Sequence, residues 1–396
     1  TTGQANTALG RYRPLYSNTT GSYNTALGDN ALYSTTTGGY NTCVGNTAGY
    51  TNTESSYNTF VGNAAGYTAS GSGATQLVYV GHNSGHLTTT ATLNTGVGSQ
   101  SLYTNTTGSQ NTAIGYNALQ ANTTGGSNTA VGSQALDANT TASNITAVGM
   151  SALTANTTGT SNTAVGAYCL DACTTGNNMT AVGLNALTAT TTGTHSDAFG
   201  INSLAAMTTG SYNVAYGNSS LTALTTGQFN VGVGHFAAGK ATTTTFNVAV
   251  GHGACNENTT AIDNTAVGGQ ALYYNTTGSN NTAVGRYALG GSSAQAYAQN
   301  TAVGSQCMNS ITTGTNNTCM GYLAGESITT GTANVCIGVD VDPSAATGTN
   351  QVVLANASTL GKGDSTAFIS AAGGPVYAGN NSANFATTSD RRIKKN

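Results

Sequence analysis

The chain has 396 residues, of which 5% are charged, and its formal net charge is −3 at pH 7. Lys and Arg together number 9, and none lies between Pro14 and Gly239, which excludes nucleic-acid binding that depends on basic side chains at phosphates. No uninterrupted apolar stretch approaches the roughly 18 residues of a membrane-spanning helix, and no signal peptide is visible.

From Asn6 to Gly338 a run of five residues, Asn-Thr-Ala-Val-Gly or a close variant, returns at a fixed interval. The run occurs twenty times, and sixteen of the nineteen intervals between its closing glycines are 17 residues long. Length alone would suggest two or three globular domains, but such a repeat builds a single elongated body whose coils contact only their neighbours.

Each unit, such as Asn111 to Gly125, contains two short apolar pieces separated by two glycine turns. The pieces are too short for helices, whereas Val, Ile and Thr between Gly and Asn favour short strands. We therefore expect two strands per coil, each paired in parallel and in register with its copy in the next coil. The fold class that this predicts is all-β, an elongated parallel β-roll or β-helix solenoid of about twenty coils over residues 1–342.

Two positions of the repeat predict how the first strand packs. The residue before the closing glycine is apolar in every copy, and we expect it to face inward. The residue two before that glycine is Ala, Gly or Cys in eighteen copies, with Phe60 and Tyr79 as the exceptions, so the other face should also meet a close neighbour. Because ordering a coil costs more conformational entropy than its few apolar side chains offset, we expect several chains to associate around a shared axis. Together with the resemblance described below, this leads us to infer a homotrimer.

The recurring Asn and Gly residues indicate structural roles. Asn opens sixteen of the twenty units, and stacked coils would align these amides in a ladder in which each side chain bonds to the next. The representative ladder residues are Asn94, Asn111, Asn128 and Asn162, and the representative turn glycines are Gly98, Gly115, Gly132 and Gly166. A flat carbohydrate-binding or ice-binding face of Asn and Thr is the weaker interpretation, because adjacent Thr residues alternate between faces.

Cysteine and histidine offer little chemistry. Most of the seven cysteines replace a small apolar residue of the repeat, so we expect buried thiols. A disulfide between Cys319 and Cys336 is disfavoured, because strand spacing exceeds the usual Cβ separation. His235 and His252 follow the glycine in neighbouring coils and should stack, and a metal site there is the less favoured alternative. We expect no metal and no cofactor.

Target binding, if the shaft performs it, is expected at irregular places. The two 19-residue intervals contain residues 69–76 and 290–299, which should emerge as loops. Five tyrosines share the position five residues after the glycine and could form an outward stripe that stacks on sugars, although shielding of strand edges is the commoner role: Tyr33, Tyr50, Tyr67, Tyr103 and Tyr273.

The repeat unit resembles the left-handed β-roll heads of trimeric autotransporter adhesins. It resembles still more closely the Asn-Thr-Ala-Val-Gly arrays of phage and phage-like tail fibres. The resemblance covers residues 1 to about 342, and it implies a trimeric and left-handed solenoid.

The repeat gives way near Asp340, and residues 343–388 are expected to form a β-rich trimeric neck. Residues 389–396 resemble the start of the endosialidase-type intramolecular chaperone, whose opening reads Ser-Asp-x-Arg-x-Lys. Ser389, Asp390, Arg392 and Lys394 occupy those places. The resemblance implies one-time self-cleavage between Ser389 and Asp390, with Ser389 as nucleophile and Lys394 as base; the alternative is a basic tail without chemistry.

The sequence thus predicts a non-enzymatic structural and attachment fibre, located outside the cell on a virion tail or a cell surface. Its expected partners are two further copies of the chain and a host cell-surface glycan or protein receptor, with no nucleic acid and no membrane insertion. A bacterial trimeric surface adhesin or extracellular filament is the alternative. A polysaccharide-degrading fibre is disfavoured, because glycosidases need paired carboxylates across a cleft and the close pair Asp340 and Asp342 lies where the repeat ends.

Overall fold

The computed structural model describes residues 2–70, 73–293, 295–371, 374–378 and 386–387. The chain is an all-β parallel β-solenoid of about 21 turns with about 17 residues per turn, which confirms the predicted fold class. The described residues contain no helix, and accordingly none with the length and apolarity to cross a membrane. The chain divides into two units, Thr1–Ile201 and Asn202–Asn396, which are described in turn.

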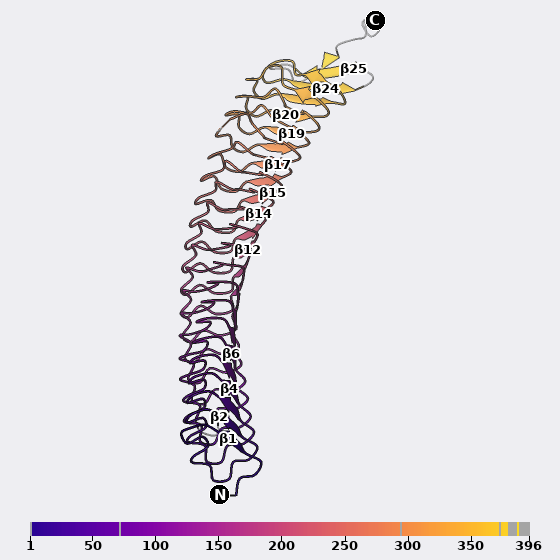
Figure 1. Cartoon of the computed structure of the whole chain (residues 1–396). Helices are drawn as coiled ribbons and strands as arrows, with labels where there is room; N and C mark the ends of the chain where they lie inside the picture. Colours follow the sequence, from indigo (N-terminus) through magenta and orange to yellow (C-terminus); the bar gives the residue numbers. More distant parts are fainter. Residues whose placement is uncertain (1, 71–72, 294, 372–373, 379–385, 388–396) are drawn as a thin grey trace, which may run out of the picture. The chain divides into compact units, whose positions relative to one another are not determined.

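The first unit contains twelve strands of three residues each, one for every copy of the repeat (Figure 1). Successive strands pair in parallel and in register, so that Thr112 lies opposite Thr129 and Ile114 opposite Val131. The strands are β1 (Thr7–Leu9), β2 (Thr25–Leu27), β3 (Thr42–Val44), β4 (Thr59–Val61), β5 (Val78–Val80), β6 (Thr95–Val97), β7 (Thr112–Ile114), β8 (Thr129–Val131), β9 (Thr146–Val148), β10 (Thr163–Val165), β11 (Thr180–Val182) and β12 (Asp197–Phe199).

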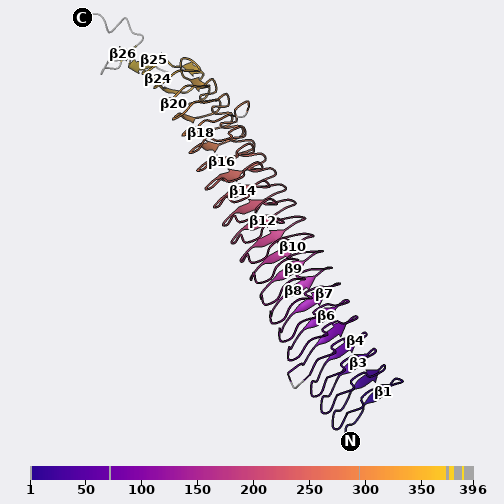
Figure 2. The same ribbon diagram turned by 90° about the vertical axis from the view of Figure 1, so that its left-hand side faces the viewer.

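The second unit continues the same pattern and then departs from it (Figure 2). The repeat strands are β13 (Val214–Tyr216), β14 (Val231–Val233), β15 (Val248–Val250), β16 (Thr265–Val267), β17 (Thr282–Val284), β18 (Thr301–Val303), β19 (Thr318–Met320) and β20 (Val335–Ile337). They are followed by β21 (Val341–Asp342), β22 (Val352–Ala355), β23 (Thr359–Leu360), β24 (Ala367–Ala371), β25 (Gly374–Ala378) and β26 (Ala386–Thr387).

The parallel ladder extends beyond the last recognisable repeat. Val352 of β22 lies opposite Val335, and β24 adds a further parallel strand in which Ala367 lies opposite Val352. Among the described residues, the pairing becomes antiparallel at β25 and β26. Gln351 takes the position that Asn occupies in other turns and donates its N–H to Asn334 Oδ1 at 3.1 Å, so the turn persists although its sequence signature has changed.

The prediction of two strands per coil is wrong, because the second apolar piece of the repeat forms turns. Leu119 is fully buried, yet its φ is +53°, and Asn117 two residues earlier has φ +54°. Two left-handed residues so close together bend the backbone too sharply for strand pairing. The pair Ala118-Leu119 therefore fills the core from a tight bend, and only the Thr-Ala-Val segment supplies a strand.

The predicted direction of the residue before the closing glycine is also wrong. In β7, Ala113 is fully buried, whereas Ile114 keeps 41% of its surface exposed. A three-residue strand has one face with two side chains and one face with a single side chain, and the interior accommodates only the small central residue beside Leu119. The outward face of the strand therefore carries Thr112 and Ile114.

The core compensates for large side chains at the central strand position. Phe60 and Tyr79 are fully buried there, and their rings stack with centroids 5.5 Å apart. Four residues after the closing glycine, where most turns have Leu, these two turns have Gly66 and Gly85. A Cβ on Gly66 would lie 2.7 Å from the Phe60 ring, and one on Gly85 would lie 2.2 Å from Tyr79. Volume is thus conserved by pairing large with small.

Candidate functional site

The residues of the predicted self-cleavage motif, Ser389, Asp390, Arg392 and Lys394, lie outside the described residues. The self-cleavage therefore stays a prediction from the resemblance.

The asparagines that open the repeats are buried and stacked in register. The N–H of Asn111 donates to Asn94 Oδ1 at 2.8 Å, and its own Nδ2 donates to the carbonyl of Gly125 at 2.9 Å. The N–H of Asn128 donates to Asn111 Oδ1 at 3.0 Å, and Asn162 Nδ2 donates to a backbone carbonyl in the same way. Each of these amides thus satisfies buried backbone groups, which would otherwise destabilise the fold.

A second asparagine ladder was missed by the sequence reasoning. It is formed by the Asn of each Asn-Thr-Thr segment, where Asn122 Nδ2 donates to Asn105 Oδ1 at 2.6 Å and Asn139 Nδ2 donates to Asn122 Oδ1 at 2.8 Å. The side chains bond directly to one another from turn to turn, as they also do in parts of the first ladder, where Asn317 Nδ2 donates to Asn300 Oδ1 at 3.1 Å. The signal was present in the sequence as a second Asn that recurs at the same 17-residue period.

The turn glycines have a backbone that other residues rarely adopt. Gly98, Gly115, Gly132 and Gly166 have φ between +135° and +141°. A Cβ on Gly115 would lie 2.3 Å from the carbonyl oxygen of Gly132 in the next turn. Both the dihedral angle and the close stacking therefore require glycine.

Aromatic side chains stack along the first unit, in two columns. In one, the rings of Tyr33, Tyr50 and Tyr67 lie 5.1 Å apart from one turn to the next, and His86 and Tyr103 continue the column at 5.0 and 5.1 Å. In the other, Tyr23, Tyr40 and Tyr57 stack at 4.8 and 5.1 Å. The predicted stripe therefore contains four of its five tyrosines.

The fifth tyrosine, Tyr273, lies in the second unit and meets the ring of Tyr274 edge to face at 4.7 Å. Tyr273 has no aromatic residue at the equivalent position one turn earlier, where Asn256 stands. Tyr273 therefore takes part in a polar network instead of a stack.

The seven cysteines are all free and buried, as predicted. Cys319 and Cys336 are opposite each other in β19 and β20 and are not bonded. Burial raises the pKa of Cys173 from 9.0 to about 11 and that of Cys255 from 9.0 to about 12. These thiols are therefore protonated at neutral pH and poorly nucleophilic.

The imidazole rings of His235 and His252 stack at 5.4 Å. Within the described ranges no group of three or more His, Cys, Asp and Glu side chains is arranged to hold a metal ion.

The two longer intervals do not simply emerge as loops. Ala69 and Ala74 in the first and Tyr297 in the second are fully buried, and Asn281 Nδ2 donates to the Tyr297 carbonyl at 2.8 Å. The additional residues thus contribute part of the core.

Of the acidic pair at the end of the repeat, Asp342 caps a backbone N–H. Asp342 is 8% exposed and accepts a hydrogen bond from the Ser327 N–H at 3.0 Å. Burial raises its pKa, more than that hydrogen bond lowers it.

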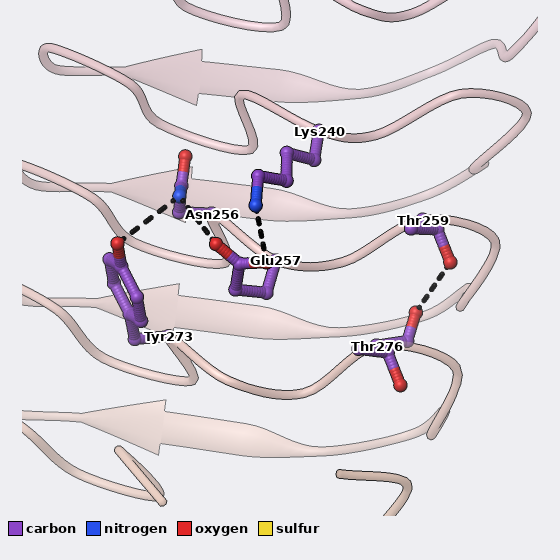
Figure 3. A network of polar contacts seen from close by, with 6 residues as sticks. All are labelled: Lys240, Asn256, Glu257, Thr259, Tyr273 and Thr276. Atoms are coloured by element: carbon purple, nitrogen blue, oxygen red, sulfur yellow. Dashed lines mark hydrogen bonds and ion pairs between the residues drawn. The ribbon is translucent and has the colours of Figure 1, made fainter. Parts of the chain in front are cut away.

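The second unit also carries a surface hollow of about 390 Å³, lined by residues of four successive turns. Its lining includes Phe236, Gly239, Lys240, Asn256, Glu257 and Tyr273. Figure 3 shows the polar network at this place, with Asn256 between Tyr273 and Glu257, and Lys240 directed at Glu257. None of these residues belongs to a strand.

The hydrogen bonds of this network fix the carboxylate. Lys240 Nζ lies 2.7 Å from Glu257 Oε2, the one ion pair among the described residues. Asn256 Nδ2 donates to Glu257 Oε1 at 3.2 Å and to the Tyr273 hydroxyl at 3.4 Å. The hollow thus combines aromatic rings, an amide and a charge pair, which is the composition of a small-molecule binding site. Sequence reasoning had not singled out this place.

Comparisons with models of protein families, with curated proteins and with solved structures find no significant match to this chain.

Proposed function

We propose that this chain is a structural and attachment fibre, a segment of a phage-type tail fibre that works as a homotrimer and carries or presents host-receptor binding. The observation that carries the proposal is the column of apolar side chains on the outward face of the strands. In the first unit it consists of Leu9, Leu27, Val44, Val61, Val80, Val97, Ile114, Val131, Val148, Val165, Val182 and Phe199. In the second it consists of Tyr216, Val233, Val250, Val267, Val284, Val303, Met320 and Ile337.

We expect another protein surface to cover this column. Parallel sheets occur almost only where both of their faces are buried, and contiguous apolar surface on a soluble protein marks an interaction site. A partner that follows the column must repeat its apolar residues at the same spacing as the turns. A second and a third copy of this chain have that spacing, and closed rotational symmetry would place their columns around one axis.

This arrangement changes the contact that the sequence suggested. The small central residues, such as Ala113, fill the core of each chain, so the Val and Ile column is the surface that would meet the other copies. The sparse charge of the chain and its ladders of buried amides suit an inert extracellular filament. Maturation by self-cleavage at Ser389 and Asp390 belongs to the same proposal and rests on the resemblance of that motif.

The test measures the native mass of the full chain by light scattering and native mass spectrometry. We expect three copies of the 39.2 kDa chain. A variant with Ile114→Lys, Val131→Lys and Val165→Lys should weaken the trimer, because charges buried without partners are costly. The control carries the same number of charges at exposed turn positions, Thr107→Lys, Thr124→Lys and Thr141→Lys.

A trimer that survives in the control and dissociates in the strand variant supports the proposal. A folded wild-type monomer would refute it, as would a trimer that is equally stable in both variants.

A further inference from the structure

The hollow of the second unit exists because one side chain is missing from a regular column. Thr222, Asn256 and Tyr273 each stand five residues after a closing glycine, and in the turn between Thr222 and Asn256 this position is Gly239. From Tyr33 to Tyr103 in the first unit the same column is filled by rings stacked about 5.1 Å apart. The gap at Gly239 is therefore one side chain wide, and its floor is backbone.

An aromatic platform lies beside the gap. Phe236 is 42% exposed, and His235 packs against its ring at 4.1 Å with a tilt of 56°. The φ of Phe236 is +54°, and this left-handed bend of the backbone recurs in the other turns at the same position. The platform is thus held by the fold and stays open to solvent.

Hydrogen-bonding groups also line the hollow. Glu257 is held by Lys240 and Asn256, and its side chain is 20% exposed, whereas that of Lys240 is 59% exposed. A carboxylate oxygen accepts more than one hydrogen bond, and an ammonium group donates three. The pair therefore keeps bonding capacity for a ligand, while its charges cancel.

We propose that this hollow binds a neutral pyranose sugar, as the terminal unit of a cell-surface glycan; the proposal rests on the attachment function proposed above and names the site and the ligand class. A pyranose has an apolar C–H face, which the negative face of an aromatic ring attracts, and an edge of hydroxyl groups that both donate and accept. The Phe236 ring matches the first, and Glu257, Lys240 and Asn256 match the second. The volume of about 390 Å³ lies in the range of small-molecule sites.

The ion pair decides between neutral and acidic ligands. Glu257 neutralises Lys240 and would repel a carboxylate or a phosphate placed beside it. Among the described residues that line the hollow, Lys240 is the one cation. A neutral sugar is therefore favoured over sialic acid or a nucleotide.

The variant that closes the hollow is Gly239→Tyr. The backbone of Gly239 is not left-handed, and a Cβ there would lie 2.7 Å from Asn256 Oδ1, the end of a flexible side chain. Tyrosine occupies this position in other turns, so the fold has a known way to accommodate it. The added ring would lie where the sugar is expected.

The matched control is Gly290→Tyr. Gly290 has the same place in its turn, its Cβ would lie 2.5 Å from Asn309 Oδ1, and the aromatic Tyr287 precedes it as Phe236 precedes Gly239. The control therefore makes the same chemical change in similar surroundings. Gly290 follows Tyr273 in the column, one turn farther from Gly239, so the gap at Gly239 itself stays open.

The experiment is saturation-transfer NMR on the full chain with the methyl glycosides of glucose, galactose and N-acetylglucosamine, and with sialic acid as the acidic probe. We expect transfer to at least one neutral sugar. Its Kd, measured by titration of this signal, should be unchanged in Gly290→Tyr and raised at least about tenfold in Gly239→Tyr, which corresponds to about 1.4 kcal/mol. Glu257→Gln should weaken the same sugar. Transfer to none of the neutral sugars, transfer to sialic acid alone, or equal binding by the two tyrosine variants would overturn the inference.

Two further outcomes separate this inference from the proposed function. If the wild-type chain is trimeric and adheres to cells, and Gly239→Tyr adheres equally well, the sugar site is wrong and the fibre proposal stands. If the wild-type chain binds the sugar through this hollow but is a monomer, the sugar site stands and the trimeric fibre is wrong.

Discussion

At the scale of single residues, glycine and asparagine set the spacing of the turns. The closing glycines bring the backbone of one turn against the next so closely that a methyl group has no room. The asparagines then use that proximity to satisfy backbone groups in the neighbouring turn. The asparagine hydrogen bonds require the close approach that glycine allows. A substitution at either residue is therefore expected to disturb the contacts of two successive turns.

Gly268 and Gly269 offer a direct test of the glycine requirement. Gly268 has φ +138°, and its Cβ would lie 2.5 Å from the Gly285 carbonyl oxygen, whereas a Cβ on Gly269 would meet nothing within 4 Å. We expect Gly268→Ala to lower the free energy of unfolding by about 2 kcal/mol or more, through strain and the clash with backbone. Gly269→Ala should change it by less than about 0.5 kcal/mol. Urea denaturation of both variants measures this, and equal effects would contradict the role of the close stacking.

Buried acidic groups predict that the chain loses stability in alkali. Burial raises the pKa of Cys255 from 9.0 to about 12, and that of Tyr79 from 10.0 to about 12. Because the folded-state pKa values are raised, the unfolded chain loses these protons first. The contribution of the protonated groups to the free energy of unfolding is therefore complete below about pH 9 and is lost as the pH rises towards 12. We expect the free energy of unfolding to fall across this range. It should fall less in Cys255→Ala, because that variant has one buried thiol fewer to ionise, and the difference should grow by up to roughly 1.4 kcal/mol with each pH step of about one.

Urea denaturation at pH 8 and at pH 11 measures that difference. Thr107→Ala, a change at an exposed residue without an ionisable group, serves as the control and should keep the wild-type pH dependence. A Cys255→Ala variant with the full alkaline loss would show that this thiol does not contribute.

At the scale of the turn, two positions share one space in the core, so that a large residue at one is paired with a small residue at the other. The central strand residue and the residue four after the closing glycine share one space, which Ala113 and Leu119 fill in one turn, and Phe60 and Gly66 in another. The left-handed φ of the second position is the same whether it is Leu or Gly, +53° at Leu119 and +58° at Gly66. The backbone of the turn is therefore independent of which of the two residues is large.

This pairing predicts that a destabilising substitution can be rescued by a second one. Phe60→Ala should lower the free energy of unfolding by about 3 to 5 kcal/mol, because it opens a cavity. Gly66→Leu alone should also destabilise, since a Cβ there would contact the Phe60 ring. The double variant recreates the common Ala and Leu pair, and we expect it to recover most of the loss. Urea denaturation of the four proteins gives the coupling free energy, and additive effects would refute the pairing.

The sequence was sufficient for some features of the turn and insufficient for others. The period and the in-register parallel pairing follow from the repeat, and the positive φ of Gly115 follows from its recurrence. The strand count failed because nothing in the residues Ala118-Leu119 distinguishes a buried bend from a buried strand. The direction of Ile114 failed because an apolar residue on a parallel sheet is buried either by its own core or by another chain. The hollow at Gly239 could not be predicted, because glycine also stands at this position in the turn of Gly290, and the neighbouring side chains Phe236, Lys240 and Glu257 come together only when the turns are stacked.

At the scale of the whole molecule, the question is what covers the outward strand face. Very few charges exist to hold copies together, since the described residues contain one ion pair and Lys240 in it is largely exposed. Association would therefore depend on apolar contact along the strand column, with little contribution from electrostatics. An assembly of this kind should be nearly insensitive to screening by salt.

Association of three chains makes stability depend on concentration. If the trimer is the folded form, dilution favours the unfolded chain by mass action, and the melting temperature rises with protein concentration. We expect the melting temperature of the wild-type chain to rise by several degrees between 1 and 100 µM, values chosen to span about two decades of mass action, and to change little between low and high NaCl. Differential scanning calorimetry at several concentrations measures both. The strand variant with Ile114→Lys, Val131→Lys and Val165→Lys should melt at a lower temperature and depend more steeply on salt, because screening would reduce repulsion among the added charges. A wild-type melting temperature that is independent of concentration, together with a native mass of one chain, would show that the apolar column is tolerated in contact with water.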